Sequence, residues 1–193
     1  MDKTRIDHIF NVFGYFGNVA RVKVVPQKNM VLVDFATPEE CQNAIHFVKD
    51  SLTLFGCPLH VTFSKYPKLV IPPGIANDQM RDYTTNPRIH RYPQGIASER
   101  VRWIVNPTTR LHVILTGRVP PSFKEDLHTL FERAGSVVSC AIEPNNKADG
   151  FKVAMALVEM ASVEDATNAL AILHNHELPN GSKLFVSFTN KKR

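Results

Sequence analysis

Hydrophobic and polar positions follow the same plan twice along the chain. Each half predicts a helix with apolar residues three and four positions apart, then two short strands of alternating apolar and polar residues, a second helix and a closing strand. The helices of the first half are expected to begin near Thr4 and Thr37, and those of the second half near Ser122 and Ser162. This internal repeat predicts two modules built on one supersecondary plan.

Only the second half contains the full set of strands. A strand over 111–115 precedes its first helix, so the order becomes strand, helix, strand, strand, helix, strand, with a closing strand over 184–188. The first half starts directly with its helix, and its closing strand is expected over 59–63. Because the missing strand would lie centrally in the sheet, we expect a truncated and weakened first module with unpaired backbone groups, rather than one in which another segment fills the place.

The predicted fold is α+β, with two ferredoxin-like (β-α-β-β-α-β) modules of which the first lacks its first strand. We assign the first module to residues 1–66, a linker to 67–107 and the second module to 108–193. In such a fold both helices cover one face of the sheet. Alternate strand residues on the other face are available to a ligand.

Composition and charge narrow the choice of function. The chain has 193 residues, of which 44% are hydrophobic, which excludes a collagen-like or wholly disordered protein. Its net charge of +5, concentrated in 67–107, fits a nucleic-acid partner without establishing one. The three cysteines lack C-x-x-C spacing, and common catalytic motifs do not occur, so we expect no enzyme, no metal and no cofactor. No apolar run approaches the roughly 18 residues of a membrane helix.

One strand of each half carries a recognisable segment. Residues 28–35 read K-N-M-V-L-V-D-F, and residues 153–160 read V-A-M-A-L-V-E-M. Both resemble the octamer K/R-G-F/Y-G/A-F-V-x-F/Y of RNA-recognition motifs, with aliphatic residues at the two positions where aromatic rings usually stack on bases. The aliphatic residues at these positions are Met30, Leu32, Met155 and Leu157.

Aliphatic replacement at these positions is similar to the polypyrimidine-tract-binding protein and heterogeneous nuclear ribonucleoprotein L family. Residues 81–92, 111–113, 120–122 and 173–176 also resemble the last two motifs of that family. The resemblance covers nearly the whole chain. It implies binding of single-stranded, pyrimidine-rich RNA in pre-mRNA splicing or mRNA regulation. It also implies a nuclear protein that shuttles to the cytoplasm and has other splicing or ribonucleoprotein factors as partners.

Alternation along the strands selects the candidate RNA-binding residues. Arg21 and Lys23 suit phosphate contacts, Thr62 and Ser64 suit base edges, and His112 stands where the family's first strand presents a ring to a base. The candidates in the first module are Arg21, Lys23, Met30, Leu32, His60, Thr62, Ser64 and Lys65. Those in the second module are His112, Ile114, Met155, Leu157, Phe185, Ser187, Thr189, Asn190, Lys191 and Lys192.

The same faces are open to another interpretation. Taken alone, Arg21 and Lys23 fit an ordinary solvated surface, and exposed Met and Leu side chains fit a protein-binding face. The alternative function is therefore a protein-interaction module that docks a peptide on its helical or sheet face.

Two helical residues indicate how the modules are arranged. Phe47 and Ile172 occupy equivalent places on the second helix of each half, one position before the buried Val48 and Leu173, so they are expected to point away from their own cores. The family resemblance implies that such residues pack the two modules back to back within a monomer, with the linker contributing. Alternatively, one or both residues lie under the linker.

Overall fold

The computed structural model of this chain describes residues 4–49, 52–66, 68–75, 77–85, 90–92, 103–117, 119, 122–143 and 153–191. The chain divides into two compact units, residues 1–104 and residues 105–193. Each unit is described by itself below. None of the helices in the described ranges is long and apolar enough to span a membrane.

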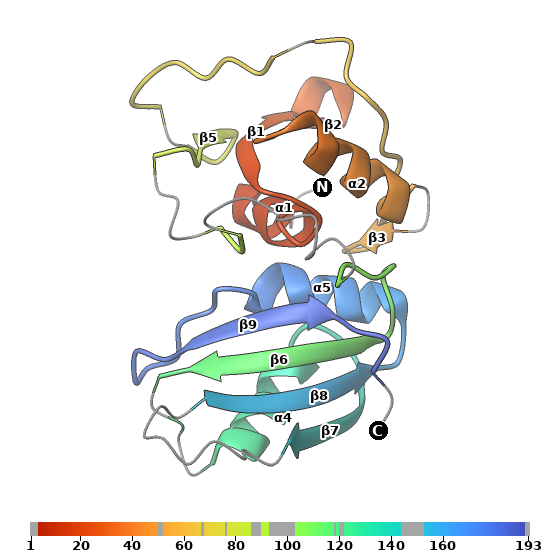
Figure 1. Cartoon of the computed structure of the whole chain (residues 1–193), viewed down its shortest axis with the longest axis vertical. Coiled ribbons are helices and arrows are strands. Elements are labelled where there is room, and N and C mark those ends of the chain that lie inside the picture. The colour runs from red at the N-terminus through yellow and green to blue at the C-terminus, as the bar shows by residue number, and fades with distance from the viewer. Residues whose placement is uncertain are drawn as a thin grey trace. The chain divides into compact units, whose positions relative to one another are not determined.

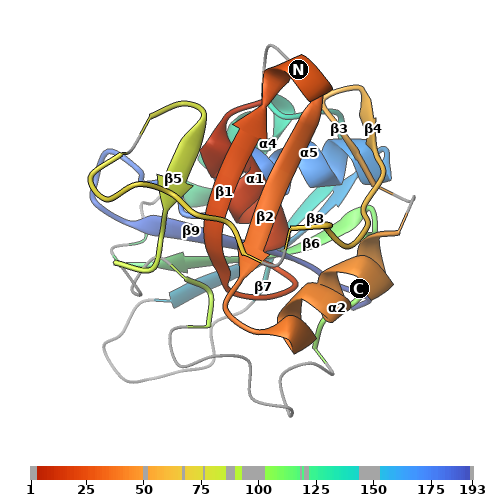
Figure 2. The same cartoon turned by 90° about the horizontal axis from the view of Figure 1, so that it is seen from above.

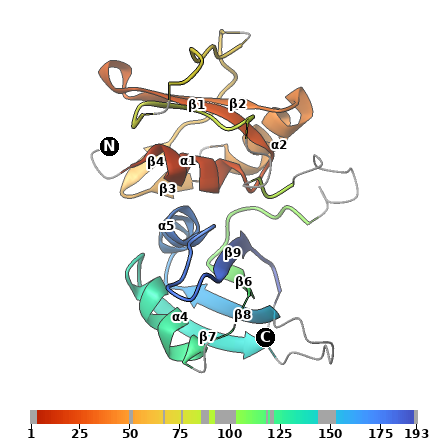
Figure 3. The same cartoon turned by 90° about the vertical axis from the view of Figure 1, so that its left-hand side faces the viewer.

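The second unit has the complete fold that its sequence predicts. Its elements are β6 (Arg110–Thr116), α4 (Phe123–Glu132), β7 (Val137–Glu143), β8 (Val153–Met160), α5 (Val163–Leu173) and β9 (Lys183–Phe188). The four strands form an antiparallel sheet in the order β7-β8-β6-β9, and α4 and α5 cover one face of it (Figures 1 and 3). The β-α-β-β-α-β order is therefore confirmed for this unit.

Period-two burial places the core of this unit between the sheet and the helices. On β6, Leu111, Val113 and Leu115 are fully buried, while the residues between them are half-buried on the other face. α5 begins after Ser162, whose side chain accepts a hydrogen bond from the backbone N–H of Asp165 at 2.9 Å, as expected of an N-cap. The side chains of β6 that face the helices are thus buried, and the half-buried residues between them lie on the uncovered face of the sheet.

The first unit contains a smaller sheet. Its elements are α1 (Ile6–Phe13), β1 (Val19–Val25), a 3₁₀ turn (Pro26–Lys28), β2 (Met30–Phe35), α2 (Pro38–Val48), β3 (Leu52–Leu54), β4 (Cys57–Leu59) and β5 (Met80–Asp82). Three strands pair in the order β2-β1-β5, as Figure 2 shows, while β3 and β4 form a separate hairpin. The fold of the first unit is accordingly irregular, as the absence of its first strand predicts.

The predicted closing strand over 59–63 is wrong. Strand β4 ends at Leu59, and residues 60–64 belong to no strand. The reason lies in the pairing of the second unit, where the corresponding strand β9 forms its ladder with β6 and with no other described strand. The described part of the first unit has no strand equivalent to β6, so the segment after Leu59 has no neighbour with which to form a ladder.

The same absence leaves one side of β2 open. In the second unit, the inward side chains of β8 are almost completely buried, with exposed fractions of 0% for Ala156 and 1% for Val158. Their counterparts in β2, Val31 and Val33, are only half-buried. Among the described residues β2 pairs with β1 alone, so the core of the first unit is incompletely covered on this side.

Strand β5 extends the first sheet from within the segment that we predicted as a linker. It pairs with β1 in the register Arg21–Asp82 and Lys23–Met80. This pairing lies on the side of β1 opposite to β2, so β5 does not occupy the place of the missing strand. Residues 80–83 therefore belong to the first compact unit.

Candidate nucleic-acid interface

The uncovered face of the second sheet is a mostly apolar platform. Cross-strand pairing places His112 on β6 between Leu157 on β8 and Ser187 on β9. One step along the sheet, Ile114 lies between Met155 and Phe185. All of these side chains are half-buried, so they are packed together but remain partly accessible. The structure thus brings together six residues that the sequence selected on three strands.

A charged group lies at the edge of this platform. Glu143, the last residue of β7, forms an ion pair with Lys191 and lies 3.7 Å from Nε2 of His112. Burial lowers the pKa of His112 below 6.5, and Lys191 acts in the same direction, while the nearby Glu143 carboxylate opposes the shift. His112 is consequently neutral near pH 7 and can offer either a ring face or a single N–H to a base.

A shallow hollow of about 70 Å³ lies beside the platform. Arg110, Ser139, Leu157, Glu159 and Lys191 contribute to its lining. Nε of Arg110 is 3.4 Å from Oε1 of Glu159, so the two charges largely compensate each other. The hollow therefore has an apolar side at Leu157 and polar groups of both signs around it.

The end of β9 leads into this hollow. The backbone N–H of Thr189 donates to the carbonyl of Arg110 at 3.1 Å, and its side-chain oxygen accepts from the backbone N–H of Lys191 at 3.1 Å. Asn190 and Lys191 are exposed beyond this bond. Lys192, also predicted as an RNA ligand, lies outside the described residues.

The face of the first sheet that is turned away from α1 carries the residues that alternation places there, and the segment between β4 and β5 runs across this side of the sheet (Figures 2 and 3). The pairings of β1 with β2 put Arg21 beside Asp34, Lys23 beside Leu32, and Val25 beside Met30. Strand β5 adds two residues to this face that we did not predict, Met80 and Asp82. This sheet therefore offers the apolar pair Met30 and Leu32 flanked by charged side chains.

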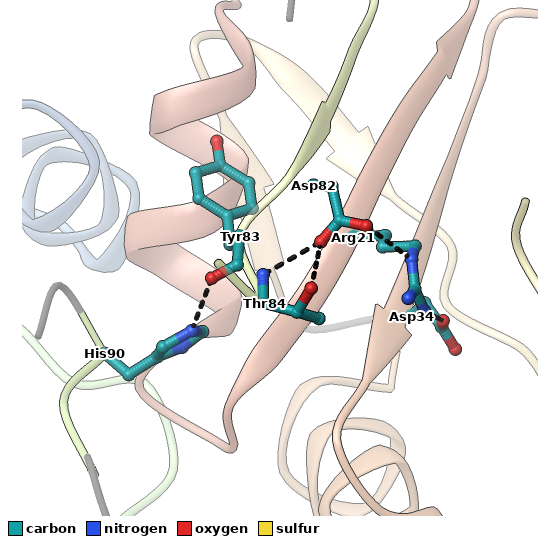
Figure 4. A network of polar contacts seen from close by, with 6 residues as sticks. All are labelled: Arg21, Asp34, Asp82, Tyr83, Thr84 and His90. Atoms are coloured by element: carbon teal, nitrogen blue, oxygen red, sulfur yellow. Dashed lines mark hydrogen bonds and ion pairs between the residues drawn. The ribbon is translucent and has the colours of Figure 1, made fainter. Parts of the chain in front are cut away.

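Arg21 is held between two carboxylates. Its Nε donates to Oδ2 of Asp82 and its terminal nitrogen to Oδ2 of Asp34, both at 3.0 Å (Figure 4). Oδ1 of Asp82 in turn accepts from the backbone N–H of Thr84 at 2.9 Å and from its hydroxyl at 2.6 Å. Burial alone would lower the pKa of Arg21, but the hydrogen bonds to Asp34 and Asp82 outweigh it and raise this pKa. The two carboxylates compensate the positive charge of Arg21, which weakens its attraction for a phosphate group.

The remaining candidates of the first module are not assembled on this sheet. The segment 60–65 has no strand structure, and most of its side chains are exposed. It contains four residues predicted to bind RNA, namely His60, Thr62, Ser64 and Lys65. Within it, the Ser64 hydroxyl accepts a hydrogen bond from the backbone N–H of Tyr66 at 3.0 Å. Their expected role depended on the closing strand, which does not form.

Phe47 and Ile172, the predicted contacts between modules, are both half-buried. The ring of Phe47 stacks near that of Phe16 in its own unit, with centroids 6.2 Å apart. Part of its surface is therefore covered within the first unit. The predicted packing of the two modules against each other stays a prediction.

Several charged residues on these faces were not among our candidates. They are Asp34, Asp82, Arg110, Glu143 and Glu159. Asp34 and Glu159 could have been selected from the sequence, because each follows a platform leucine by two positions and so shares its face. Arg110 and Glu143 stand two positions from His112 and from Ala141 on the same strands, so alternation also places them on this face, whereas Asp82 depends on the pairing of β5 with β1. Among the described residues, no three His, Cys, Asp or Glu side chains are grouped as a metal site requires.

Comparison with known proteins agrees with this geometry. A family model described as RNA recognition motif (also RRM, RBD or RNP domain) matches residues 1–86, and a second RNA recognition motif model matches residues 117–182. The chain is 31% identical over 186 residues to polypyrimidine tract-binding protein homolog 3 of Arabidopsis thaliana, a match that covers 95% of this chain and 39% of the relative. The chain thus spans less than half the length of this relative.

Solved structures of single motifs are also similar. The third RRM domain of Hrb1 matches with 23% identity and a TM-score of 0.35, over 45% of this chain and 81% of that chain. The RRM of RNA15 matches with 18% identity and a TM-score of 0.36, over 44% of this chain and 92% of that chain.

The two motif models cover most of the sequence, and both describe RNA-binding modules rather than enzymes. The Arabidopsis relative aligns with nearly the whole chain and confirms the resemblance that the aliphatic octamers indicated. The chain therefore belongs to the RNA-recognition-motif family and, within it, to the polypyrimidine-tract-binding proteins.

Proposed function

We propose that this chain binds single-stranded, pyrimidine-rich RNA on the faces of its sheets that are turned away from the helices, and that it acts in pre-mRNA splicing or other mRNA regulation. The observation that carries the proposal is the platform of the second unit, where His112, Ile114, Met155 and Leu157 lie side by side on two paired strands. The Arabidopsis relative is a polypyrimidine tract-binding protein homolog, which supports the choice of pyrimidines.

The chemistry of the platform favours small bases. Stacking of a base on an aromatic side chain contributes about 1–3 kcal/mol, and aliphatic side chains at the centre reduce this contribution to apolar contact. Affinity then depends more on polar groups around the platform, such as Ser187, Lys191 and the backbone beyond Phe188. Pyrimidines fit such a surface because their single ring exposes most of its polar edge.

The electrostatics of the second unit support moderate affinity. Arg110 and Lys191 are each paired with a carboxylate, so the surface carries balanced charges instead of a basic patch. Phosphate contacts are consequently expected to be few, and the dependence of RNA affinity on salt should be shallow for a nucleic-acid-binding protein but still present.

The proposal extends to the setting of the protein. We expect a monomer in the nucleus that shuttles to the cytoplasm and works with other splicing or ribonucleoprotein factors. The back-to-back packing of the two modules through Phe47 and Ile172 belongs to the same proposal. It would direct the two RNA-binding faces outward and loop the RNA between them.

Binding of short homopolymers to the full chain tests the proposal. We expect oligouridine and oligocytidine to bind more tightly than oligoadenosine at a stated salt concentration, measured by fluorescence anisotropy. Leu157→Asp places a charge on the platform and should weaken binding at least about tenfold, because it adds repulsion and removes apolar contact. Ile142→Asp is the matched control, since Ile142 is exposed and is paired in register with Ala156, whose side chain faces the helices.

Two results would contradict the proposal. One is equal, weak binding of all homopolymers at low salt. The other is an interaction with RNA that Leu157→Asp leaves unchanged. Binding of a peptide that is insensitive to salt but lost in Leu157→Asp would instead favour the protein-interaction alternative.

A further inference from the structure

Each sheet places an arginine-held carboxylate next to a platform leucine. Asp34 follows Leu32 by two positions on β2, and Glu159 follows Leu157 by two positions on β8, so each carboxylate shares the face of its leucine. The two carboxylates occupy equivalent places in the repeat, because Asp34 pairs in register with Arg21 on β1 and Glu159 with Ser139 on β7.

The arginines reach these carboxylates from different strands. Arg21 lies on β1 and contacts Asp34 at 3.0 Å. In the second unit the place of Arg21 is taken by Ser139, and the cation comes instead from Arg110 on β6, at 3.4 Å from Glu159. An arginine–carboxylate pair is therefore present in both units, although the arginine comes from a different strand in each. The shared fold alone does not require such a pair.

The arginine engages only one oxygen of each carboxylate. In the first unit it is Oδ2 of Asp34, and in the second unit Oε1 of Glu159. The described contacts include no hydrogen bond to Oδ1 of Asp34 or to Oε2 of Glu159. A carboxylate is purely an acceptor, so the second oxygen is available to an N–H donor that lies over the leucine. Side-chain exposures of 26% for Asp34 and 36% for Glu159 leave room for such a donor.

We propose that each of these carboxylates accepts a hydrogen bond from the exocyclic amino group of a cytosine that lies on the adjacent leucine, and that this contact selects cytosine over uracil. The inference rests on the proposed binding of pyrimidine-rich RNA. Cytosine presents N4 as a donor, followed by two acceptors, N3 and O2. Uracil presents the acceptor O4 in place of N4, and its lone pairs would face the carboxylate.

The lining of the hollow in the second unit matches the whole edge of cytosine. Glu159 supplies the acceptor for N4, while the Ser139 hydroxyl and the Arg110 and Lys191 side chains supply donors for N3 and O2. Adenine also has an amino donor, but a C–H group takes the place of its second acceptor, so one of these donors would lose its partner. Removing such a partner in a partly buried site is unfavourable.

The carboxylates are held in position by their neighbours. Asp82 accepts two bonds from Thr84 and one from Arg21, and Arg21 in turn fixes Asp34. Arg21 and Asp82 thus act as positioning residues for Asp34, as the arrangement in Figure 4 shows. The positive charge of each arginine also reduces the repulsion between the carboxylate and the RNA backbone.

The test compares the affinities of the full chain for oligocytidine and oligouridine of equal length. Glu159→Gln keeps the size of the side chain but replaces an acceptor by an amide that can donate to O4 of uracil. We expect the ratio of cytosine to uracil affinity to fall about tenfold, with oligouridine binding unchanged or tighter. Asp34→Asn makes the same change in the first unit. Glu125→Gln, on the exposed side of α4, is the matched control and should leave the ratio unchanged.

The outcomes separate this inference from the proposed function. If the wild-type chain binds both oligomers and Glu159→Gln leaves their ratio unchanged, or raises both affinities equally, the cytosine contact is refuted while pyrimidine binding stands. Wild-type binding of oligoadenosine as tightly as oligocytidine, abolished in Glu159→Gln, would refute the choice of cytosine. If the wild type binds no oligonucleotide, the proposed function fails and this inference with it.

Discussion

Tyr83 stacks on Phe10 with ring centroids 4.1 Å apart and an interplanar angle of 27°. The Tyr83 hydroxyl also donates to Oδ1 of Asp7 on α1 at 3.1 Å, and Arg81 contacts the same oxygen at 2.6 Å. These contacts attach the end of β5 to the first helix. They explain how a strand of three residues, in a segment without a regular apolar pattern, becomes part of the first sheet.

Tyr83→Ala should therefore weaken the first unit. Tyr83 is 3% exposed, and loss of a buried aromatic ring is expected to lower the free energy of unfolding by about 3 kcal/mol. Tyr83→Phe removes only the hydroxyl bond and should cost about 1 kcal/mol. Denaturant unfolding measures both effects, with hydrogen exchange used as the probe that reports on each unit separately. Tyr66→Ala serves as the control because Tyr66 is 61% exposed, and an equal loss in the control would contradict the assignment of β5.

Arg21 and Lys23 are neighbours on β1, but we expect different effects on RNA binding. Lys23 is half-buried on the face of β1 that is turned away from α1 and suits a phosphate contact, so Lys23→Gln should reduce the slope of log affinity against log salt by about one. Arg21 already bridges two carboxylates, so Arg21→Gln should leave this slope almost unchanged and lower the stability of the first unit. Titrations at several salt concentrations distinguish the two. A larger slope change in Arg21→Gln would restore the role first predicted for it.

The second module should lose stability in mild acid through His112. Burial lowers the pKa of this imidazole in the folded chain below its ordinary value of 6.5. Well above pH 6.5 the ring is neutral in both the folded and the unfolded chain, so it does not make the free energy of unfolding depend on pH. As the pH falls from 6.5 through the lower folded pKa, the unfolded chain takes up the proton first, so the free energy of unfolding decreases until both states are protonated.

Unfolding in denaturant between pH 7.5 and pH 5 isolates this effect. His112→Asn should show a smaller decrease in stability over this range than the wild type. His128→Asn is the control, because His128 is exposed on α4 and lies 3.5 Å from Glu132. Identical pH profiles for the wild type and His112→Asn would contradict the depressed pKa.

The packing of the two modules is tested by rotational diffusion. If Phe47 and Ile172 hold the modules together, Ile172→Glu should let them tumble independently, with shorter and unequal correlation times by NMR relaxation. Phe47→Glu should act in the same way but also disturb the stacking on Phe16. Joint tumbling of the Ile172→Glu variant, at the correlation time of the wild type, would refute the back-to-back arrangement.

Periodicity in the sequence predicts the second module well, because each of its strands has the partner that the pattern assumes. Residues 154–160 of β8 alternate buried and half-buried positions, and β8 is flanked on both sides by strands of the same kind. The segment after Leu59 has a similar pattern, but a β-strand forms only where a neighbour completes its hydrogen bonds. Its failure to form a strand could not be read from its own residues. It follows from the missing partner.

The candidate binding residues were likewise predicted only as far as the pattern of a single strand allows. Alternation selects His112, Met155 and Leu157 because their direction depends only on their own strands. Arg110 precedes the strand predicted over 111–115, and the ion-pair partners of Arg110 and Glu143, namely Glu159 on β8 and Lys191 beyond the end of β9, cannot be read from their own strands. Which charged residues lie opposite each other across a sheet depends on the register between the strands. A period-two pattern fixes the face on which a side chain lies, but a shift by two residues keeps that face, so the pattern does not fix the register.

The open side of β2 should be visible in backbone dynamics. Strand β8 is flanked by β7 and β6, whereas the described residues give β2 a partner only in β1. Amides of β2 that point away from β1 should therefore exchange with solvent at least about tenfold faster than those of β8, since local opening there breaks no ladder. Native-state hydrogen exchange with residue resolution measures this. Strand β1 is the internal control, because between Arg21 and Lys23 it is paired on both sides and should be protected more than β2 within the same unit. Equal protection of β1, β2 and β8 would mean that another segment covers the open side, and the first module would then be complete.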